Sequence, residues 1–144
     1  MNRINTWILM IALLVACGQT ARSTAAEPDI DIWKAAASGN IEVVKQHLAA
    51  GTNVDAKDSP GGSTPLLVAA AFGQVETVKY LIEKGANVKA QSNDGATALH
   101  GAAFFCHTEI VKLLLAKGAV VDAKNARGET PLISVAGEWS EELE

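Results

Sequence analysis

The chain has little cysteine, few aromatic residues and no excess of basic charge. Its 144 residues include only 2 cysteines, too few for a disulfide framework, and 12 lysines and arginines against 16 acids. A nucleic-acid-binding protein normally carries a basic patch, so we expect no nucleic-acid partner. Aromatic residues make up 5%, but hydrophobic residues as a whole reach 49%, which excludes an intrinsically disordered chain. The length leaves room for one domain, or for a targeting segment and a smaller domain.

The N-terminal segment differs in charge from the rest of the chain. Residues 1–26 contain Arg3 and Arg22 but no acid, and an uncharged apolar run extends from Trp7 to Ala16. This run is shorter than the roughly 20 residues that a membrane-spanning helix needs. A buried helix is the alternative, but no polar face interrupts the run. The pattern is typical of a cleavable secretory signal over residues 1–26, and it predicts a bacterial-type exported protein.

Two cleavage sites fit this segment. The residues from Leu14 to Cys17 resemble a lipobox, the motif at which bacterial lipoproteins are cut and acylated on the cysteine. Ordinary cleavage after Ala26 also fits, because Thr24 and Ala26 are small. The first site predicts a lipid anchor on Cys17 as the protein's one membrane contact, and the second predicts a periplasmic protein. Both alternatives stay open.

An internal repeat runs through the rest of the chain. A Gly-x-Thr-x-Leu pattern begins at Gly62, Gly95 and Gly128, at intervals of 33 residues. An Ala-Ala pair followed by glycine recurs 34 residues apart, at Gly39 and Gly73. The chain therefore divides into units over residues 28–61, 62–94, 95–127 and 128–144, the last of them incomplete.

Each unit has the pattern of two short helices and a loop. Thr64 can cap a first helix that starts with Pro65, and Gly73 can take the left-handed conformation that ends it. A second helix with apolar residues at helical spacing follows and ends near Gly85, before a hairpin loop. Opposite charges three residues apart are expected on its outer side, in the pairs Glu42–Lys45, Glu76–Lys79 and Glu109–Lys112.

This pattern resembles the ankyrin repeat, a family with a 33-residue period and a Thr-Pro-Leu-His signature. The resemblance covers residues 28–144. It implies an all-α solenoid of helix–turn–helix units joined by β-hairpin loops, here preceded by the signal segment. His100 holds the histidine position of the signature, which implies a hydrogen bond between units.

The two ends of the array differ from its middle. Gln46 and His47 stand where the second unit has Tyr80 and Leu81. The first unit is therefore expected to be a polar cap, with His47 in solvent. The last unit stops at Glu144, before a second helix is complete, so we expect a longer protein or a C-terminus that rests on something else.

No catalytic constellation is visible in the sequence. Cys106 and His107 come closest to a nucleophile or half of a metal site, but no second Cys-His pair or acid cluster accompanies them. Cys106 also stands where Gly39 and Gly73 end their helices. We therefore expect no enzymatic activity, no metal and no cofactor.

The aromatic residues give the clearest functional signal. Phe72, Phe104 and Phe105 fall at the ends of first helices, and Trp139 follows about one unit later. The resemblance implies that this region faces a concave groove beside the loops. Exposed aromatic clusters often bind partners, although these side chains could instead pack together and support the stack. The predicted protein-binding surface combines them with loop residues Lys57, Asp58, Gln91, Asn93, Lys124, Arg127 and Glu129.

Two functions fit these features. The first is a monomeric, non-enzymatic, exported module that binds another protein through its concave face. The second is an accessory or targeting domain of a longer exported enzyme, whose catalytic part lies beyond residue 144. The reading frame after Glu144 would distinguish them, whereas the fold alone cannot.

Overall fold

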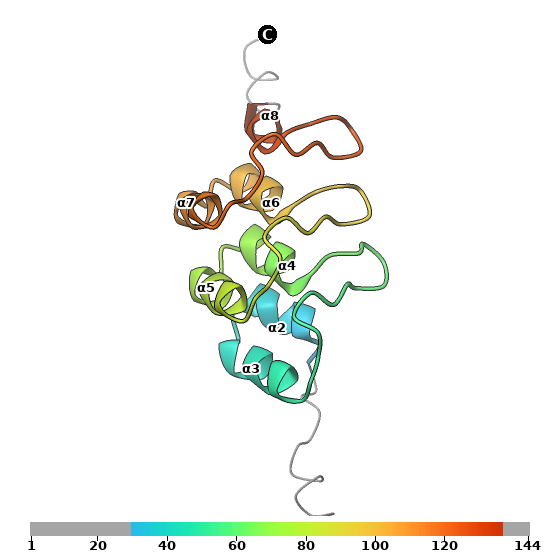
Figure 1. The fold of residues 1–144 in the computed structure, drawn as a ribbon, viewed down its shortest axis with the longest axis vertical. Helices are drawn as coiled ribbons and strands as arrows, with labels where there is room; N and C mark the ends of the chain where they lie inside the picture. Colours follow the sequence, from blue (N-terminus) through green and yellow to red (C-terminus); the bar gives the residue numbers. More distant parts are fainter. Residues whose placement is uncertain (1–29, 137–144) are drawn as a thin grey trace, which may run out of the picture.

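The computed structural model describes residues 30–136, which form a stack of short helix pairs (Figure 1). The pairs are α2 (Ile32–Ser38) with α3 (Ile41–Ala49), α4 (Pro65–Ala71) with α5 (Val75–Glu83), and α6 (Ala98–Phe104) with α7 (Thr108–Ala116). Helix α8 (Pro131–Ala136) follows these three pairs in the chain. The expected signal segment with Cys17, and also Trp139, lie outside the described residues. Within residues 30–136 no helix is long and apolar enough to cross a membrane.

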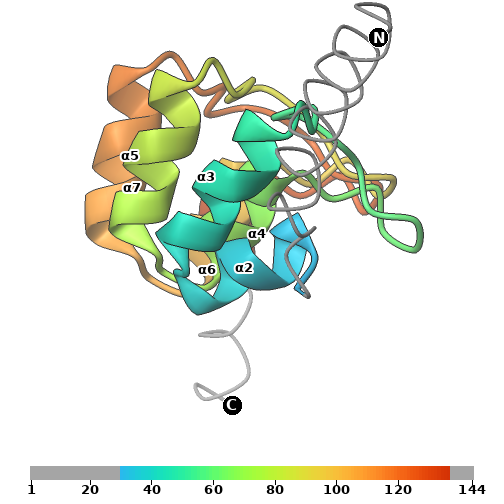
Figure 2. The same ribbon diagram turned by 90° about the horizontal axis from the view of Figure 1, so that it is seen from below.

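The helices form two layers, with the loops projecting beyond one of them. The first helices α2, α4, α6 and α8 stack in one layer and the second helices α3, α5 and α7 in the other (Figures 1 and 2). Helix α4 packs between α2 and α6, and α6 also packs against α8. We call the side made by the first helices and the loops the inner face, and the side made by the second helices the outer face.

The core runs through the stack without interruption. In the first helices it consists largely of alanines with no exposed surface, namely Ala35, Ala36, Ala69, Ala70 and Ala102. Such short side chains let neighbouring first helices approach closely at native packing density. Between the two layers lie larger side chains that are also wholly buried, including Leu66, Val78, Leu81, Ile110 and Leu114. Each unit thus buries its apolar surface against the next, as a repeat stack requires.

The loops turn back on themselves but do not form the β-hairpins that the sequence analysis expected. In the part of the chain that the structure describes, pairing is limited to one isolated bridge, between Gln91 and Thr97. Each loop is closed by two backbone hydrogen bonds at its base, one donated by Asp58, Ser92 or Asn125 and one accepted by the same residue, at 2.9–3.2 Å. The described part of the fold is therefore all-α.

The turn from the first to the second helix needs a left-handed residue. Gly39 and Gly73 adopt φ angles of 71° and 74° there, as predicted. Cys106 occupies the same position with φ at 57°, and among residues 30–136 no other non-glycine residue has a positive φ. For an L-residue this conformation costs about 1–2 kcal/mol. The third unit therefore holds backbone strain that the first two avoid.

Replacing Cys106 by glycine is expected to raise the free energy of unfolding by a few tenths to about 1 kcal/mol. Relief of the strain exceeds the extra entropy that glycine gives the unfolded chain. Urea unfolding measures the change, and Cys106→Ala, which removes the thiol but keeps the strain, is the control. A glycine variant no more stable than the alanine variant would contradict the strain, and an alanine variant less stable than the wild type would show that the thiol contributes packing.

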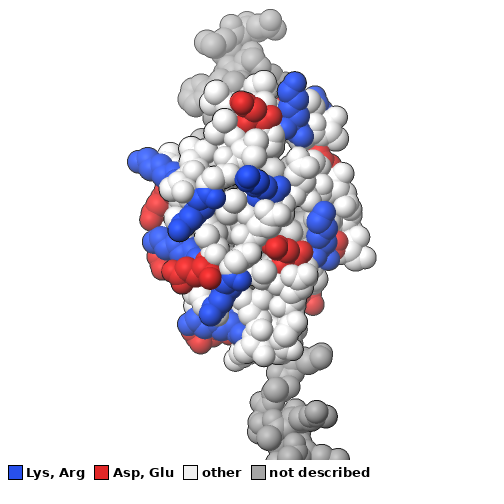
Figure 3. All heavy atoms as spheres, in the orientation of Figure 1, with Lys and Arg blue, Asp and Glu red and all other residues white. Residues whose placement is uncertain are grey.

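Ion pairs on the outer face confirm two of the three predicted pairs. Lys45 lies 2.7 Å from Glu42, and Lys79 lies 2.9 Å from Glu76. Glu109, expected to pair with Lys112, lies instead 3.7 Å from Lys79 of the preceding unit. The hydrogen bond to Glu76 and, more weakly, the charge of Glu109 raise the pKa of Lys79. Lysines and acids are interspersed along the edge formed by the second helices (Figure 3).

The first unit was predicted to be a polar cap with its side chains in solvent, and the structure confirms this for only one of two residues. Gln46 is exposed, as predicted. His47 is half-buried, and its Nε2 lies 2.8 Å from the carbonyl oxygen of Ile30. The ring therefore ties the start of the described chain to α3 rather than extending freely into water.

Candidate functional site

The three phenylalanines are exposed on the structure. Their exposed fractions are 64% for Phe72, 41% for Phe104 and 56% for Phe105, whereas core residues such as Leu66 have none. The rings of Phe104 and Phe105 meet edge to face, with centroids 4.9 Å apart. Phe72 lies one unit earlier, at the end of α4, outside this pair. Side chains this exposed contribute little to the core and are available for contact.

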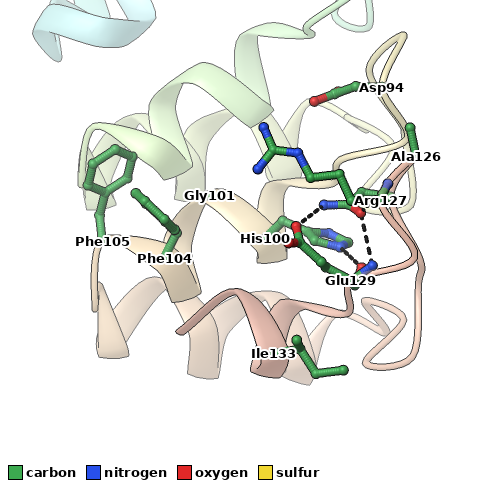
Figure 4. A pocket seen from close by; sticks show the side chains of 10 residues that line it. Asp94, His100, Gly101, Phe104, Phe105, Ala126, Arg127, Glu129 and Ile133 are labelled. Carbon is green, nitrogen blue, oxygen red and sulfur yellow. Dashed lines mark hydrogen bonds between the residues drawn. The ribbon is translucent and has the colours of Figure 1, made fainter. Parts of the chain in front are cut away.

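A hollow of about 570 Å³ opens on the inner face between α6, α8 and the loop over residues 125–129. Phe104 and Phe105 line it on one side, and Asp94, Arg127 and Glu129 line it on the side of the loops, with Ile133 below Glu129 (Figure 4). Figure 4 shows His100 between the aromatic end and the loop. The hollow therefore has an apolar end and a charged end.

His100 fastens this loop to α6. Its Nδ1 accepts a hydrogen bond from the backbone N–H of Thr97 at 3.1 Å and lies 2.9 Å from the hydroxyl of Thr97. Its Nε2 lies 3.1 Å from the carbonyl oxygen of Glu129, in the next unit. The ring is only 4% exposed. The bond between units that the resemblance implied for His100 is therefore present.

Asn125 fixes the shape of the loop. Its Oδ1 accepts from the backbone N–H groups of Arg127 and Glu129, at 2.9 and 3.0 Å, and its Nδ2 donates to the carboxylate of Glu129 at 2.9 Å. The backbone N–H of Ala126 donates to the carbonyl of Asp94 in the preceding loop, at 2.7 Å. The backbone that carries Arg127 is thus held from within the loop and from its neighbour.

Only four residues of the predicted protein-binding surface line the hollow. They are Phe104, Phe105, Arg127 and Glu129. The Nζ of Lys57 donates to the carbonyl of Gln91 at 2.8 Å, which ties one loop to the next.

The remaining predicted loop residues lie outside the hollow. Asp58 accepts from the backbone N–H of Ser63 within its own loop. Asn93 and Lys124 are exposed on their loops.

Asp94, Asn125 and Ile133 also line the hollow but were not predicted from the sequence. Asn125 had a signal that could have been used, because it aligns in the repeat with Asp58 and Ser92. Short polar side chains at this point of a turn bond to the backbone two residues on. Ile133 occupies the histidine position of the repeat in the last unit, and its exposed fraction is 53%.

Cys106 and His107 do not form a reactive pair in the structure. The Nε2 of His107 lies 3.0 Å from the carbonyl oxygen of Ala71, so the ring joins two units. Cys106 is exposed and borders a second, mostly apolar hollow of about 490 Å³ between α6, α7 and the start of α8. Between residues 30 and 136 no group of three or more His, Cys, Asp or Glu side chains is placed to hold a metal ion.

A family model described as ankyrin repeats (three copies) matches residues 32–125, more than half of the chain. A search of curated proteins found no match.

Proposed function

The chain belongs to the ankyrin repeat family, and we propose that it is a non-enzymatic module that binds another protein through its inner face. Ankyrin repeats are generally protein–protein interaction modules and are typically non-catalytic. The observation that carries the proposal is the edge-to-face pair of Phe104 and Phe105, exposed beside a hollow with a rigid loop. Large exposed aromatic side chains at the rim of a concavity are common anchors of protein interfaces.

The joint replacement of Phe104 and Phe105 by alanine is expected to weaken partner binding by about 2 kcal/mol or more. The melting temperature is expected to change little, because Phe104 and Phe105 lie outside the buried core with exposed fractions of 41% and 56%. A partner captured with the wild-type protein is then titrated by calorimetry against both forms. Phe72→Ala, measured separately, tests whether the surface extends to the preceding unit.

Lys79→Ala and Lys112→Ala are the controls, because both lysines lie on the outer-face helices α5 and α7. They are expected to leave binding unchanged. Loss of binding in the lysine variants, with retention in the phenylalanine variants, would move the site to the outer face. A large fall in melting temperature of the phenylalanine variant would instead support a role in holding the stack.

We also propose that the protein is exported and that Cys17 carries a lipid. The support is the basic start, the apolar run from Trp7 to Ala16 and the lipobox-like residues before Cys17.

Labelled palmitate is expected to enter the wild-type protein in the membrane fraction, and Cys17→Ser is expected to release an unlabelled protein. Soluble periplasmic protein that begins at Glu27 would overturn the lipid anchor but keep export. Full-length protein in the cytosol would overturn both.

A further inference from the structure

We propose that the hollow between α6, α8 and the loop over residues 125–129 recognises a carboxylate adjacent to a large apolar side chain. The occupant is an extended segment of the partner protein that carries both groups. This inference rests on the proposed function and specifies the chemistry of its site. It follows from which charged groups around the hollow are already engaged and which are free.

Arg127 is the free charged group. Its backbone N–H is held by Asn125, but its guanidinium makes no ion pair or hydrogen bond within residues 30–136. Figure 4 shows the side chain extending from the loop over the hollow, toward α6. A guanidinium presents several donors in a planar fork, a shape that matches a carboxylate. An unengaged fork on a fixed backbone is therefore suited to an incoming acid.

The acids of the hollow are engaged within their own loops. The carboxylate of Asp94 accepts from the hydroxyl of Ser92 and from the backbone N–H of Ala96. The hydroxyl of Ser92, aided by the weaker attraction of Arg127, lowers the pKa of Asp94. The carboxylate of Glu129 accepts from Asn125. Each acid thus already has hydrogen-bond partners that shape its loop, whereas the guanidinium of Arg127 has none among the described residues.

The other end of the hollow suits an apolar side chain. Phe104 and Phe105 line it with exposed fractions of 41% and 56%. The edge-to-face contact of the two phenylalanines fixes their relative orientation. At about 570 Å³ the hollow falls in the range of about 300–1,000 Å³ that is typical of ligand sites. It therefore accommodates an apolar side chain and a neighbouring carboxylate together.

The charged and apolar ends are held in a fixed relation. His100 ties the carbonyl of Glu129 to α6, the helix that ends with Phe104. The bond from Ala126 to Asp94 ties the same loop to the loop before it. Little ordering is then needed when a partner binds, which favours affinity.

The test uses N-acetylphenylalanine, which carries a phenyl group beside a carboxylate, as the probe. N-acetylphenylalanine amide is its neutral match, and phenethylamine is a cation of similar size. Each probe is titrated into the ¹⁵N-labelled protein, and amide shifts are followed at Gly101, Phe105 and Arg127. The proteins are the wild type, Arg127→Gln and, as a control, Lys117→Gln at the exposed end of α7.

We expect the acid to shift these amides with an apparent Kd roughly five-fold lower than that of the neutral amide. The difference is expected to vanish in Arg127→Gln and to persist in Lys117→Gln. Equal binding of acid and amide, a preference for phenethylamine, or no shift at these positions would overturn the proposed chemistry. Partner binding that depends on Phe104 and Phe105 would still support the proposed function, so the two failures are distinguishable.

Discussion

Replacing Leu114 by alanine is expected to lower the free energy of unfolding by about 2–5 kcal/mol. Leu114 has no exposed surface and lies on α7, in the core that joins the third unit to the rest of the stack. Removal of its isobutyl group leaves a cavity that the close-packed alanines of the first helices cannot fill. Because units in a stack depend on their neighbours, the loss is expected to reach the unfolding of the whole stack. Urea unfolding followed by circular dichroism measures it.

Leu115 is the matched control for this prediction. It is the next residue on α7 and the same amino acid, but its exposed fraction is 41%. We expect Leu115→Ala to cost less than about 1 kcal/mol. Equal losses at both positions would mean that α7 does not present Leu114 to the core as the structure shows.

The repeat and its helices could be predicted from the sequence because they depend on local patterns. Thr64 caps α4 by accepting from the N–H of Leu67, and Pro65 begins the helix. The glycine position at the end of the first helix predicted the backbone of Gly73, and also that Cys106 would be placed in a conformation that suits glycine. Both features need only a few neighbouring residues, so a repeating sequence reveals them.

Contacts between units were less accessible from the sequence. The spacing of Glu109 and Lys112 fits a pair within α7, yet Glu109 turns to Lys79 on the neighbouring α5. His47 was assigned to solvent, yet it contacts the carbonyl of Ile30. The rotation of one unit on the next decides both contacts, and a helical pattern does not contain it. Loop bonds such as that from Lys57 to Gln91 have the same origin.

The candidate site could be predicted in its aromatic part but not in its shape. The resemblance to ankyrin repeats implied that Phe104 and Phe105 face a groove beside the loops, and both side chains are exposed. The hollow itself is made by two units and a loop, so Ile133 and Asn125 entered it only through the structure. Sequence spacing also does not show which charged side chains are hydrogen-bonded. In the structure Asp94 and Glu129 accept hydrogen bonds within their loops, whereas the guanidinium of Arg127 has no such partner among the described residues.

Replacing His100 by alanine is expected to lower the free energy of unfolding by about 3 kcal/mol. The buried N–H of Thr97 loses its acceptor, at a cost of about 1–3 kcal/mol for a buried group left unpaired. The carbonyl of Glu129 also loses its contact with the ring, although it still accepts from the N–H of Asn125. The loop that carries Arg127 also loses its tie to α6. We therefore expect weaker partner binding even at temperatures where the variant is fully folded.

His107→Ala is the matched control for His100→Ala. His107 also joins two units through Nε2, but it is half-buried and makes one such contact, to Ala71. It is expected to cost about 1 kcal/mol and to leave the loop over residues 125–129 in place. Thermal unfolding and calorimetric titration of the captured partner separate the two effects. Unchanged binding in folded His100→Ala would show that Asn125 and the contact with Asp94 hold the loop without the histidine.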